Sequence, residues 1–271
     1  MVMPFFEREW AGRTDIATIQ GLSGASISPS STAPLSLWRE YAASQGWVAG
    51  YIQLATSVEL GERVPGAELV ISNWVFLLDL TKGDVLDSAS TIVRRKVRKA
   101  VKLGAVLVDD RSVLTERMKL LYPLAMERVG APSRYRFSAQ TLERWALDPS
   151  SIVLGARVGD DIEAVSVFSV AGRGAEYNIN ASTECGRDLT AWLIWNAASR
   201  LRERGIAELN LGGGVSPGDG VYRFKERFNG ASKPVRAVCQ IYDRASYDEL
   251  CGHADAAASQ GWFPAYRASR S

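Results

Sequence analysis

The sequence predicts an α+β fold built on a mixed sheet. Two strand-like segments, 152–157 and 162–170, are joined by the tight turn Gly159-Asp160-Asp161, which requires antiparallel pairing. A helix-like segment then separates the strand-like residues 177–181 from 206–211, and a connection of this length permits a parallel crossover. Strands of both orientations, interleaved with helices, are typical of a mixed α+β sheet.

The other elements follow from hydrophobic periodicity and from capping residues. We expect strands at 47–57, 69–80, 105–109 and 235–242, and helices at 88–103, 113–129, 188–204 and 221–228. Asp87, Ser88 and Ser90 are candidate N-caps for the first of these helices and Asp188 for the third, and Gly104 and Gly205 are candidate helix stops. The segment Gly21–Pro34 is rich in Ser, Gly, Ala and Pro, so we expect a loop there.

Composition excludes several classes of protein. Lys and Arg number 32 and Asp and Glu 30, so the net charge of +2 predicts no general affinity for nucleic acids or membranes, and any such partner must bind a local patch. The three cysteines, Cys185, Cys239 and Cys251, lack a metal-binding spacing and read as reduced thiols. No signal peptide or membrane span is expected, which together with the thiols favours a cytoplasmic protein.

Histidine chemistry is also excluded. The only histidine, His253, lies near the C-terminus and reads as a surface residue, so neither a Ser-His-Asp system nor a histidine-based metal site is expected. The sequence contains no phosphate loop of the GxxxxGK type and no dinucleotide-binding fingerprint. An enzyme built from this chain must therefore use backbone amides, lysine, tyrosine and carboxylates.

A glycine loop is the first candidate site. The predicted strand at 206–211 leads directly into Gly212, Gly213 and Gly214, and Lys225 lies about one turn inside the helix that follows. Glycines after a strand allow close approach of a ligand, and a helix start offers free N–H groups. A lysine at that point can neutralise an oxyanion or a phosphate. A flexible surface turn followed by a solvated helix is the alternative interpretation.

A basic helix is the second candidate site. Its apolar face is predicted to comprise Val93, Val97, Ala100 and Val101. The cations expected to bind the donor are Arg94, Arg95, Arg98, Lys99 and Lys102. Several cations on one face of a nearly neutral protein bind phosphodiester backbones electrostatically. The alternative is a solvated face that pairs with acidic residues elsewhere.

Five segments together resemble the C-terminal GNAT-like domain of FemABX-type transferases. They are Tyr177–Ser182, Ala191–Trp195, Leu209–Gly213, Phe224-Lys225 and Phe228–Gly230. The resemblance covers about 150–242, and the stretch 94–104 resembles the end of the family's first domain. It implies two GNAT-like domains with the first one reduced. On this basis we expect a first domain over 1–130, a second over 131–242, and a C-terminal segment, 243–271, that packs back on the first domain.

The resemblance also implies an activity. FemABX members take an aminoacyl group from aminoacyl-tRNA and form an amide on a peptidoglycan precursor, and relatives act on antibiotic-like compounds. The partners implied are thus aminoacyl-tRNA and a small-molecule or peptide amine, with no cofactor. The family's Phe-Lys pair at the reaction centre falls on Phe224 and Lys225. We expect Lys225 to stabilise the oxyanion and Asp219 or Tyr222 to relay a proton.

One departure from the acetyl-CoA enzymes of the superfamily bears on the donor. Those enzymes place a glycine-rich pyrophosphate loop before the helix that begins here near Asp188, whereas this chain has the segment 183–188 with one glycine and two acids. Acidic side chains repel pyrophosphate, which disfavours CoA. Two alternatives stay open: an acyl-CoA-dependent N-acyltransferase, and a GNAT-like module that binds RNA or protein without catalysis.

Overall fold

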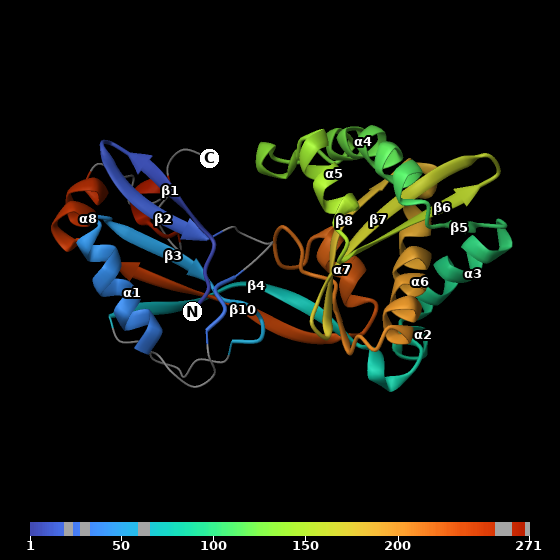
Figure 1. The fold of residues 1–271 in the computed structure, drawn as a ribbon, viewed down its shortest axis with the longest axis horizontal. Coiled ribbons are helices and arrows are strands. Elements are labelled where there is room, and N and C mark those ends of the chain that lie inside the picture. The colour runs from blue at the N-terminus through green and yellow to red at the C-terminus, as the bar shows by residue number, and fades with distance from the viewer. Residues whose placement is uncertain (19–23, 28–32, 59–65, 253–261, 269–271) are drawn as a thin grey trace. The chain divides into compact units, whose positions relative to one another are not determined.

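The chain folds into two compact units in a computed structural model that describes residues 1–18, 24–27, 33–58, 66–252 and 262–268. Unit 1 comprises residues 1–74 and 233–271, and unit 2 comprises residues 75–232. Strand β4 (Ala67–Asp79) begins in unit 1 and ends in unit 2, and β10 (Ala231–Ile241) returns the chain to unit 1. Figure 1 shows the elements of each unit in chain order.

Unit 1 is a mixed sheet covered by helices. Its elements are β1 (Phe5–Trp10), β2 (Arg13–Thr18), α1 (Ala33–Ser44), β3 (Ala49–Gln53), α8 (Arg244–Cys251) and the 3-10 helix η4 (Ala265–Arg267), together with parts of β4 and β10. β1 and β2 pair antiparallel, β2 and β3 parallel, and β3 and β10 antiparallel. An aromatic group packs around buried Ile16 and Leu35, with Phe5 in edge contact with Trp38 and Trp47.

The C-terminal segment completes the core of unit 1. Tyr247 and Leu250 of α8 and Tyr266 of η4 pack against Val48 and Ala49 at the start of β3. The first and the last parts of the chain therefore share one small hydrophobic core.

In unit 2 the strands of the mixed sheet follow the order β4-β9-β8-β7-β6-β5. Its strands after β4 are β5 (Val106–Val108), β6 (Ser151–Val158), β7 (Asp161–Ala171), β8 (Gly174–Ser182) and β9 (Glu208–Asn210). Its helices are α2 (Val85–Ser88), α3 (Thr91–Lys102), α4 (Arg111–Arg128), α5 (Ala139–Leu147), α6 (Leu189–Glu203) and α7 (Gly220–Glu226), with 3-10 turns η1 (Leu80–Lys82), η2 (Ser133–Tyr135) and η3 (Cys185–Asp188). β8 and β9 pair in parallel and the other neighbours in this sheet pair antiparallel.

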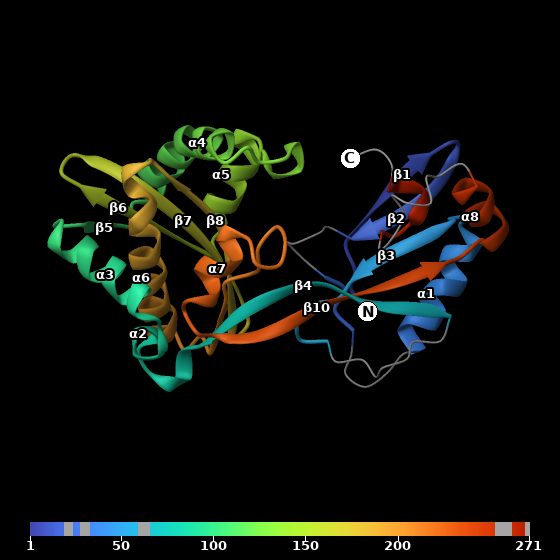
Figure 2. The same ribbon diagram turned by 180° about the vertical axis from the view of Figure 1, so that it is seen from behind.

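Two helical layers cover the two faces of this sheet. α4 and α5 pack on one face, where Leu114, Met118 and Leu142 meet Val165 and Ile179. α3 and α6 lie side by side on the other face (Figure 2). Both faces are therefore buried, which is why β6 and β7 read as nearly continuous apolar runs in the sequence.

The expected class, α+β with a mixed sheet, is confirmed, including the Gly159 hairpin and the parallel step from β8 to β9. Details differ. Val101, predicted on the buried face of α3, is 59% exposed. Asp188 occupies the N-cap position of α6 but its side chain makes no capping hydrogen bond. Sequence reasoning missed β1, β2, α1, α5 and α8. His253 and much of the Gly21–Pro34 segment lie outside the described residues.

The compact units divide the chain at 74/75 and 232/233, whereas the resemblance placed domain boundaries near 130 and 242. The residues from Val75 to about 130 pack with the later strands: α3 lies on α6, and α4 lies on β8. The basic helix and the glycine loop consequently belong to the same unit.

Candidate active site

Strands β8 and β9 diverge at one point in unit 2. They pair only over Gly174–Glu176 and Glu208–Asn210, so Glu176 and Asn210 are the last paired residues. Beyond that point β8 remains paired with β7 as far as Ser182. The chain after β9 instead follows β4, because the N–H of Leu211 donates to the carbonyl of Phe76. We call this separation the β8/β9 fork.

Lys225 reaches into the fork from α7. Its Nζ donates to the carbonyl oxygen of Gly213 at 2.8 Å and lies 5.6 Å from the centroid of the Tyr177 ring on β8. A Cβ added to Gly212 would lie 3.1 Å from this Nζ, and the φ of Gly212 is +71°, so glycine meets both a steric and a conformational requirement. The structure thus brings Lys225 and the predicted glycine loop together.

The charge of Lys225 is held in a poorly solvated position. Burial lowers the pKa of the Lys225 ammonium to about 8, although the nearby Asp219 carboxylate opposes the shift. At neutral pH the group is still largely cationic, and no carboxylate forms an ion pair with it in the described part of the chain. A desolvated cation of this kind is suited to stabilising negative charge that develops on a reacting oxygen.

Asp219 organises the glycine loop. Its Oδ2 accepts from the N–H groups of Val215 and Ser216 at 2.7 and 2.9 Å, and its Oδ1 accepts from the N–H of Tyr222 at 2.7 Å. A Cβ on Gly214 would clash with this carboxylate at 2.4 Å, so the glycine permits the approach. Desolvation raises the pKa of Asp219, but the backbone donors outweigh it and hold the pKa below its usual value.

These contacts change the expectation for two groups. Because Asp219 is a weak base that caps α7, proton relay by Asp219 stays a prediction that its surroundings do not favour. The amide of Gly212 donates to the side-chain oxygen of Asn210 at 2.7 Å, so this amide is not free to bind a ligand.

The other two predicted residues of α7 are packing residues in this structure. The half-buried Tyr222 ring meets Phe76 edge-on, with the centroids 4.9 Å apart. Phe224 meets Phe228 edge-on at 5.6 Å, and Phe228 is fully buried. Both rings anchor α7 to the core of unit 2, which fixes where Lys225 can reach.

In the basic helix α3, the predicted cations are exposed or partly exposed and form no ion pair within the described part of the chain, with the exception of Lys99. Arg95, Arg98 and Lys102 are exposed and Arg94 is partly so, and none of them forms an ion pair with another described residue. Lys99 is different, because its Nζ binds the Asp188 carboxylate at 2.9 Å, where it is joined by Lys96 at 3.0 Å.

The basic helix contacts the helix that carries Lys225. The Nζ of Lys96 lies 5.8 Å from the centroid of the Phe224 ring. The N–H of Ser90, the N-cap of α3, donates to the carbonyl of Arg227 at 2.8 Å. Lys96 was missed by sequence reasoning, since nothing in a run of cations distinguishes the one that faces an aromatic ring.

The loop before α6 is closed by internal contacts. The N–H of Gly186 donates to the Thr183 hydroxyl at 2.9 Å, and the N–H of Thr183 donates to the carbonyl of Glu163 at 2.9 Å. The acids are also engaged: Glu184 pairs with Arg128 and Arg187, and Asp188 pairs with the two α3 lysines. The two lysines hold the pKa of Asp188 below its usual value, so Asp188 stays ionised and its charge is balanced by Lys96 and Lys99.

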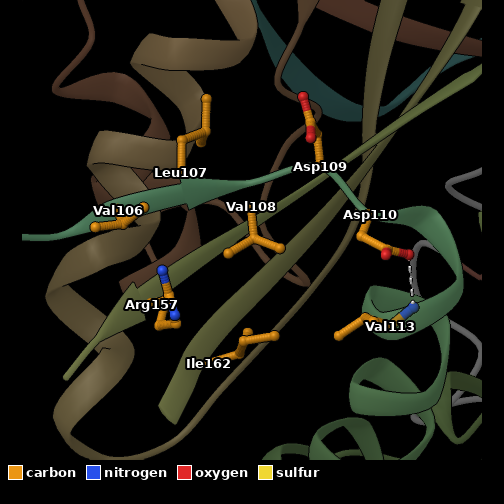
Figure 3. A pocket seen from close by; sticks show the side chains of 8 residues that line it. All are labelled: Val106, Leu107, Val108, Asp109, Asp110, Val113, Arg157 and Ile162. Carbon is orange, nitrogen blue, oxygen red and sulfur yellow. Dashed lines mark hydrogen bonds between the residues drawn. The ribbon is translucent and has the colours of Figure 1, made fainter. Parts of the chain in front are cut away.

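A separate hollow of about 360 Å³ lies at the edge strand β5 (Figure 3). It is lined by Val106, Leu107, Val108, Asp109, Asp110, Val113, Arg157 and Ile162. No predicted site residue lines it. Among the described residues, no group of three or more His, Cys, Asp or Glu side chains is placed to hold a metal ion, and no helix is long and apolar enough to cross a membrane.

Comparison with known proteins gives matches in structure but not in sequence. No protein-family model matches the chain, and no curated protein matches it. The solved structure of FemX matches 91% of this chain and 86% of its own, with a TM-score of 0.70 at 13% identity.

Two further solved structures are similar over most of the chain. The C-terminal domain of a putative lysylphosphatidylglycerol synthetase from Agrobacterium fabrum matches 89% of this chain and 81% of its own, with a TM-score of 0.62 at 15% identity. The structure of L-PGS from Bacillus licheniformis matches 87% of this chain and 80% of its own, with a TM-score of 0.58 at 12% identity. The chain has the FemX-like fold, and the predicted FemABX/GNAT-like resemblance is confirmed at the level of the fold.

Proposed function

We propose that this protein is an acyltransferase that moves an aminoacyl group from aminoacyl-tRNA to an amine. The single observation that carries the proposal is the contact between α3 and α7. The unpaired cations of α3 form a surface for RNA phosphates, and Lys96 links that helix to Phe224, the residue next to Lys225. A donor bound along α3 would thus have its reactive end directed toward the β8/β9 fork.

The reaction requires little chemical activation of the donor by the protein. An aminoacyl ester is already activated, so holding a neutral amine beside its carbonyl supplies much of the rate. The carbonyl oxygen becomes an oxyanion on attack, and a positioned cation or N–H donor at such a site is worth roughly 3–4 kcal/mol. Lys225, poorly solvated and without a carboxylate partner in the described residues, has the properties for this role.

Fold likeness supports an aminoacyl group as the group that is transferred. The Agrobacterium fabrum structure is the C-terminal domain of a putative lysylphosphatidylglycerol synthetase, a name that includes a lysyl group. The acceptor here, whether a peptide, a cell-wall precursor or an antibiotic-like compound, is proposed only as an amine. The acyl-CoA alternative has less support, because the amides of Thr183 and Gly186 already donate to groups of the protein.

The test is a search for product by mass spectrometry. The protein is incubated with charged total tRNA, or separately with acetyl-CoA, in the presence of a panel of amines. We expect new aminoacyl amides only with charged tRNA. Acetylated products formed with acetyl-CoA, together with low-micromolar binding of acetyl-CoA by calorimetry, would replace this proposal with the acyl-CoA alternative. A protein that binds RNA but yields no product with either donor would favour the non-catalytic module.

A further inference from the structure

Strand β5 forms the outer edge of the sheet in unit 2. It is the last strand in the order β4-β9-β8-β7-β6-β5, and β6 is its one strand neighbour among the described residues. The outward N–H and C=O groups of such a strand are a template for pairing with another strand. The function proposed above makes no use of this edge, nor of the hollow of about 360 Å³ beside it (Figure 3).

The β5 edge is apolar along its whole length. The strand reads Val106-Leu107-Val108 and Val106 is 47% exposed, whereas β1, the edge strand of unit 1, carries Glu7, Arg8 and Glu9. Charged side chains along an edge strand hinder pairing with another chain, and β5 has none. Burying exposed apolar side chains favours association. Three more of them flank β5 in the sequence: Val101, Leu103 and Val113.

The two faces of β5 limit the register in which a second β5 strand can pair with it. Leu107 packs toward the core beneath α3 and α6, and Val108 packs toward the core beneath α4 and α5. Val106 shares the face of Val108, because side chains alternate along a strand. An antiparallel pair centred on Leu107 places Val106 opposite the partner's Val108 and the two Leu107 residues opposite each other. Each apolar side chain then meets another on its own face, which a register shifted by one residue would not allow.

The charges at the two ends of β5 are complementary in this register. Arg157, the neighbour of Val106 on β6, lies at one end of β5, and Asp110 lies at the other (Figure 3). Both side chains are exposed, and neither forms an ion pair with another described residue. Because the partner strand runs in the opposite direction, the partner's Asp110 lies near Arg157. Gly104 leaves the space between them open, since a Cβ added there would have no atom within 4 Å.

We propose that β5 is the contact surface for a second copy of this chain, which continues the sheet of unit 2 across a two-fold axis. A two-fold axis makes every contact occur twice, so the contact between Arg157 and the partner's Asp110 forms on both sides of Leu107. The strand pairing joins the outward backbone groups of the two copies and covers Val106. A partner of unrelated sequence would lack this match of faces and charges. The inference does not depend on the aminoacyl-transfer function.

The first test is sedimentation equilibrium of the full chain over a wide range of protein concentration. The wild-type protein should associate to a dimer. Val106→Lys should weaken association roughly tenfold or more, because it places a charge within the apolar contact. The matched control is Leu124→Lys, at a 61% exposed leucine farther along α4, which should leave the dimer unchanged. A wild-type protein that stays monomeric at every concentration, or a dimer that Val106→Lys does not weaken, would overturn the proposal.

A charge exchange tests the register. Arg157→Glu should weaken the dimer roughly tenfold or more, because it sets a like charge against the partner's Asp110, and adding Asp110→Lys should restore association to within about threefold of wild type. Asp110 also caps α4 through the N–H groups of Ser112 and Val113, but losing a cap cannot by itself strengthen association. Asp110→Asn keeps a capping oxygen and should weaken the dimer severalfold. A folded double variant without recovery, or an unchanged dimer in Asp110→Asn, would contradict the proposed pairing.

Discussion

Lys225 shows how a single side chain acquires properties that its residue type lacks. The glycine loop folds over it, Gly213 accepts its hydrogen bond, and the Tyr177 ring lies close to its ammonium. The amine therefore loses much of its hydration without gaining an ion-pair partner among the described residues. Both the proposed catalysis and a measurable cost in stability follow from that placement.

Replacing Lys225 should greatly slow the transfer reaction and barely change the affinity for the donor. If its charge stabilises an oxyanion that exists only in the transition state, Lys225→Ala should lower the single-turnover rate roughly a hundredfold or more and leave donor affinity nearly unchanged. Lys225→Arg should not restore the rate, because the planar guanidinium does not fit the same space. The control is Lys82→Ala, at an 82% exposed lysine of the same unit. A Lys225→Ala rate within about threefold of wild type would remove Lys225 from the chemistry.

Lys225 should also make stability depend on pH. Its pKa is about 8 in the folded protein and 10.5 in the unfolded chain, so the unfolded state binds the proton more tightly. Below pH 8 both states are charged and the buried charge costs stability, and the cost is relieved as the pH rises from 8 to 10.5. Lys225→Met should therefore be more stable than wild type at pH 7, with a difference that narrows by pH 10. Urea unfolding measures this, and a constant difference would contradict it.

At the scale of elements, helix α3 has a buried apolar face and an exposed cationic face. Val93, Val97 and Ala100 are buried against unit 2, while the opposite side carries the cations. Two of its lysines are committed to Asp188, so the helix offers fewer free charges than its sequence suggests. The unpaired arginines are the ones expected to meet RNA.

Neutralising those arginines should weaken RNA binding in a salt-dependent way. Arg94→Ala with Arg98→Ala should reduce affinity for charged tRNA and lower the slope of log K against log salt by about one for each phosphate that α3 no longer neutralises. The control is Lys119→Ala with Arg144→Ala, which removes equal charge from α4 and α5 on the other face of the sheet. An unchanged slope in the arginine variant, or an equal change in both variants, would show that α3 is only a solvated face.

The elements of unit 2 were largely predictable except for α5, whereas in unit 1 the sequence indicated β3, β4 and β10 but not β1, β2, α1 and α8. Helix α3 is indicated in the sequence by the Ser90 cap, by its apolar spacing and by Gly104. By contrast, β1 contains Glu7, Arg8 and Glu9, whose burial alternates only weakly, so no period was visible. The same limit applies to the site: Lys225 follows from the glycine loop, whereas the position of Tyr177 beside it depends on where two strands separate, which no local pattern encodes.

At the scale of the whole chain, unit 1 joins residues that are about 250 positions apart. β2 places Asp15 at 0% exposure, and the hydroxyl of Tyr266 donates to its Oδ2 at 2.9 Å. Arg267 donates to the same oxygen at 2.6 Å, and Arg8 of β1 binds Oδ1 at 2.7 Å. A carboxylate with this many donors is fully satisfied despite its burial. The C-terminal segment is thereby held to the first strands of the chain by one buried charge.

Removing that charge should destabilise the protein, because it leaves cations without a counter-charge. Losing one partner of a buried ion pair typically costs about 3–5 kcal/mol. Since Arg8 is 33% exposed and Arg267 17%, water will screen part of that, and we expect Asp15→Asn to lower the unfolding free energy by about 2–3 kcal/mol. Asp248→Asn is the control, because its pair with Arg244 is exposed and should be worth less than about 1 kcal/mol. If urea unfolding gave equal losses for the two variants, the buried charge would not be what secures the end of the chain, and the apolar contacts of Tyr247, Leu250 and Tyr266 would have to hold it alone.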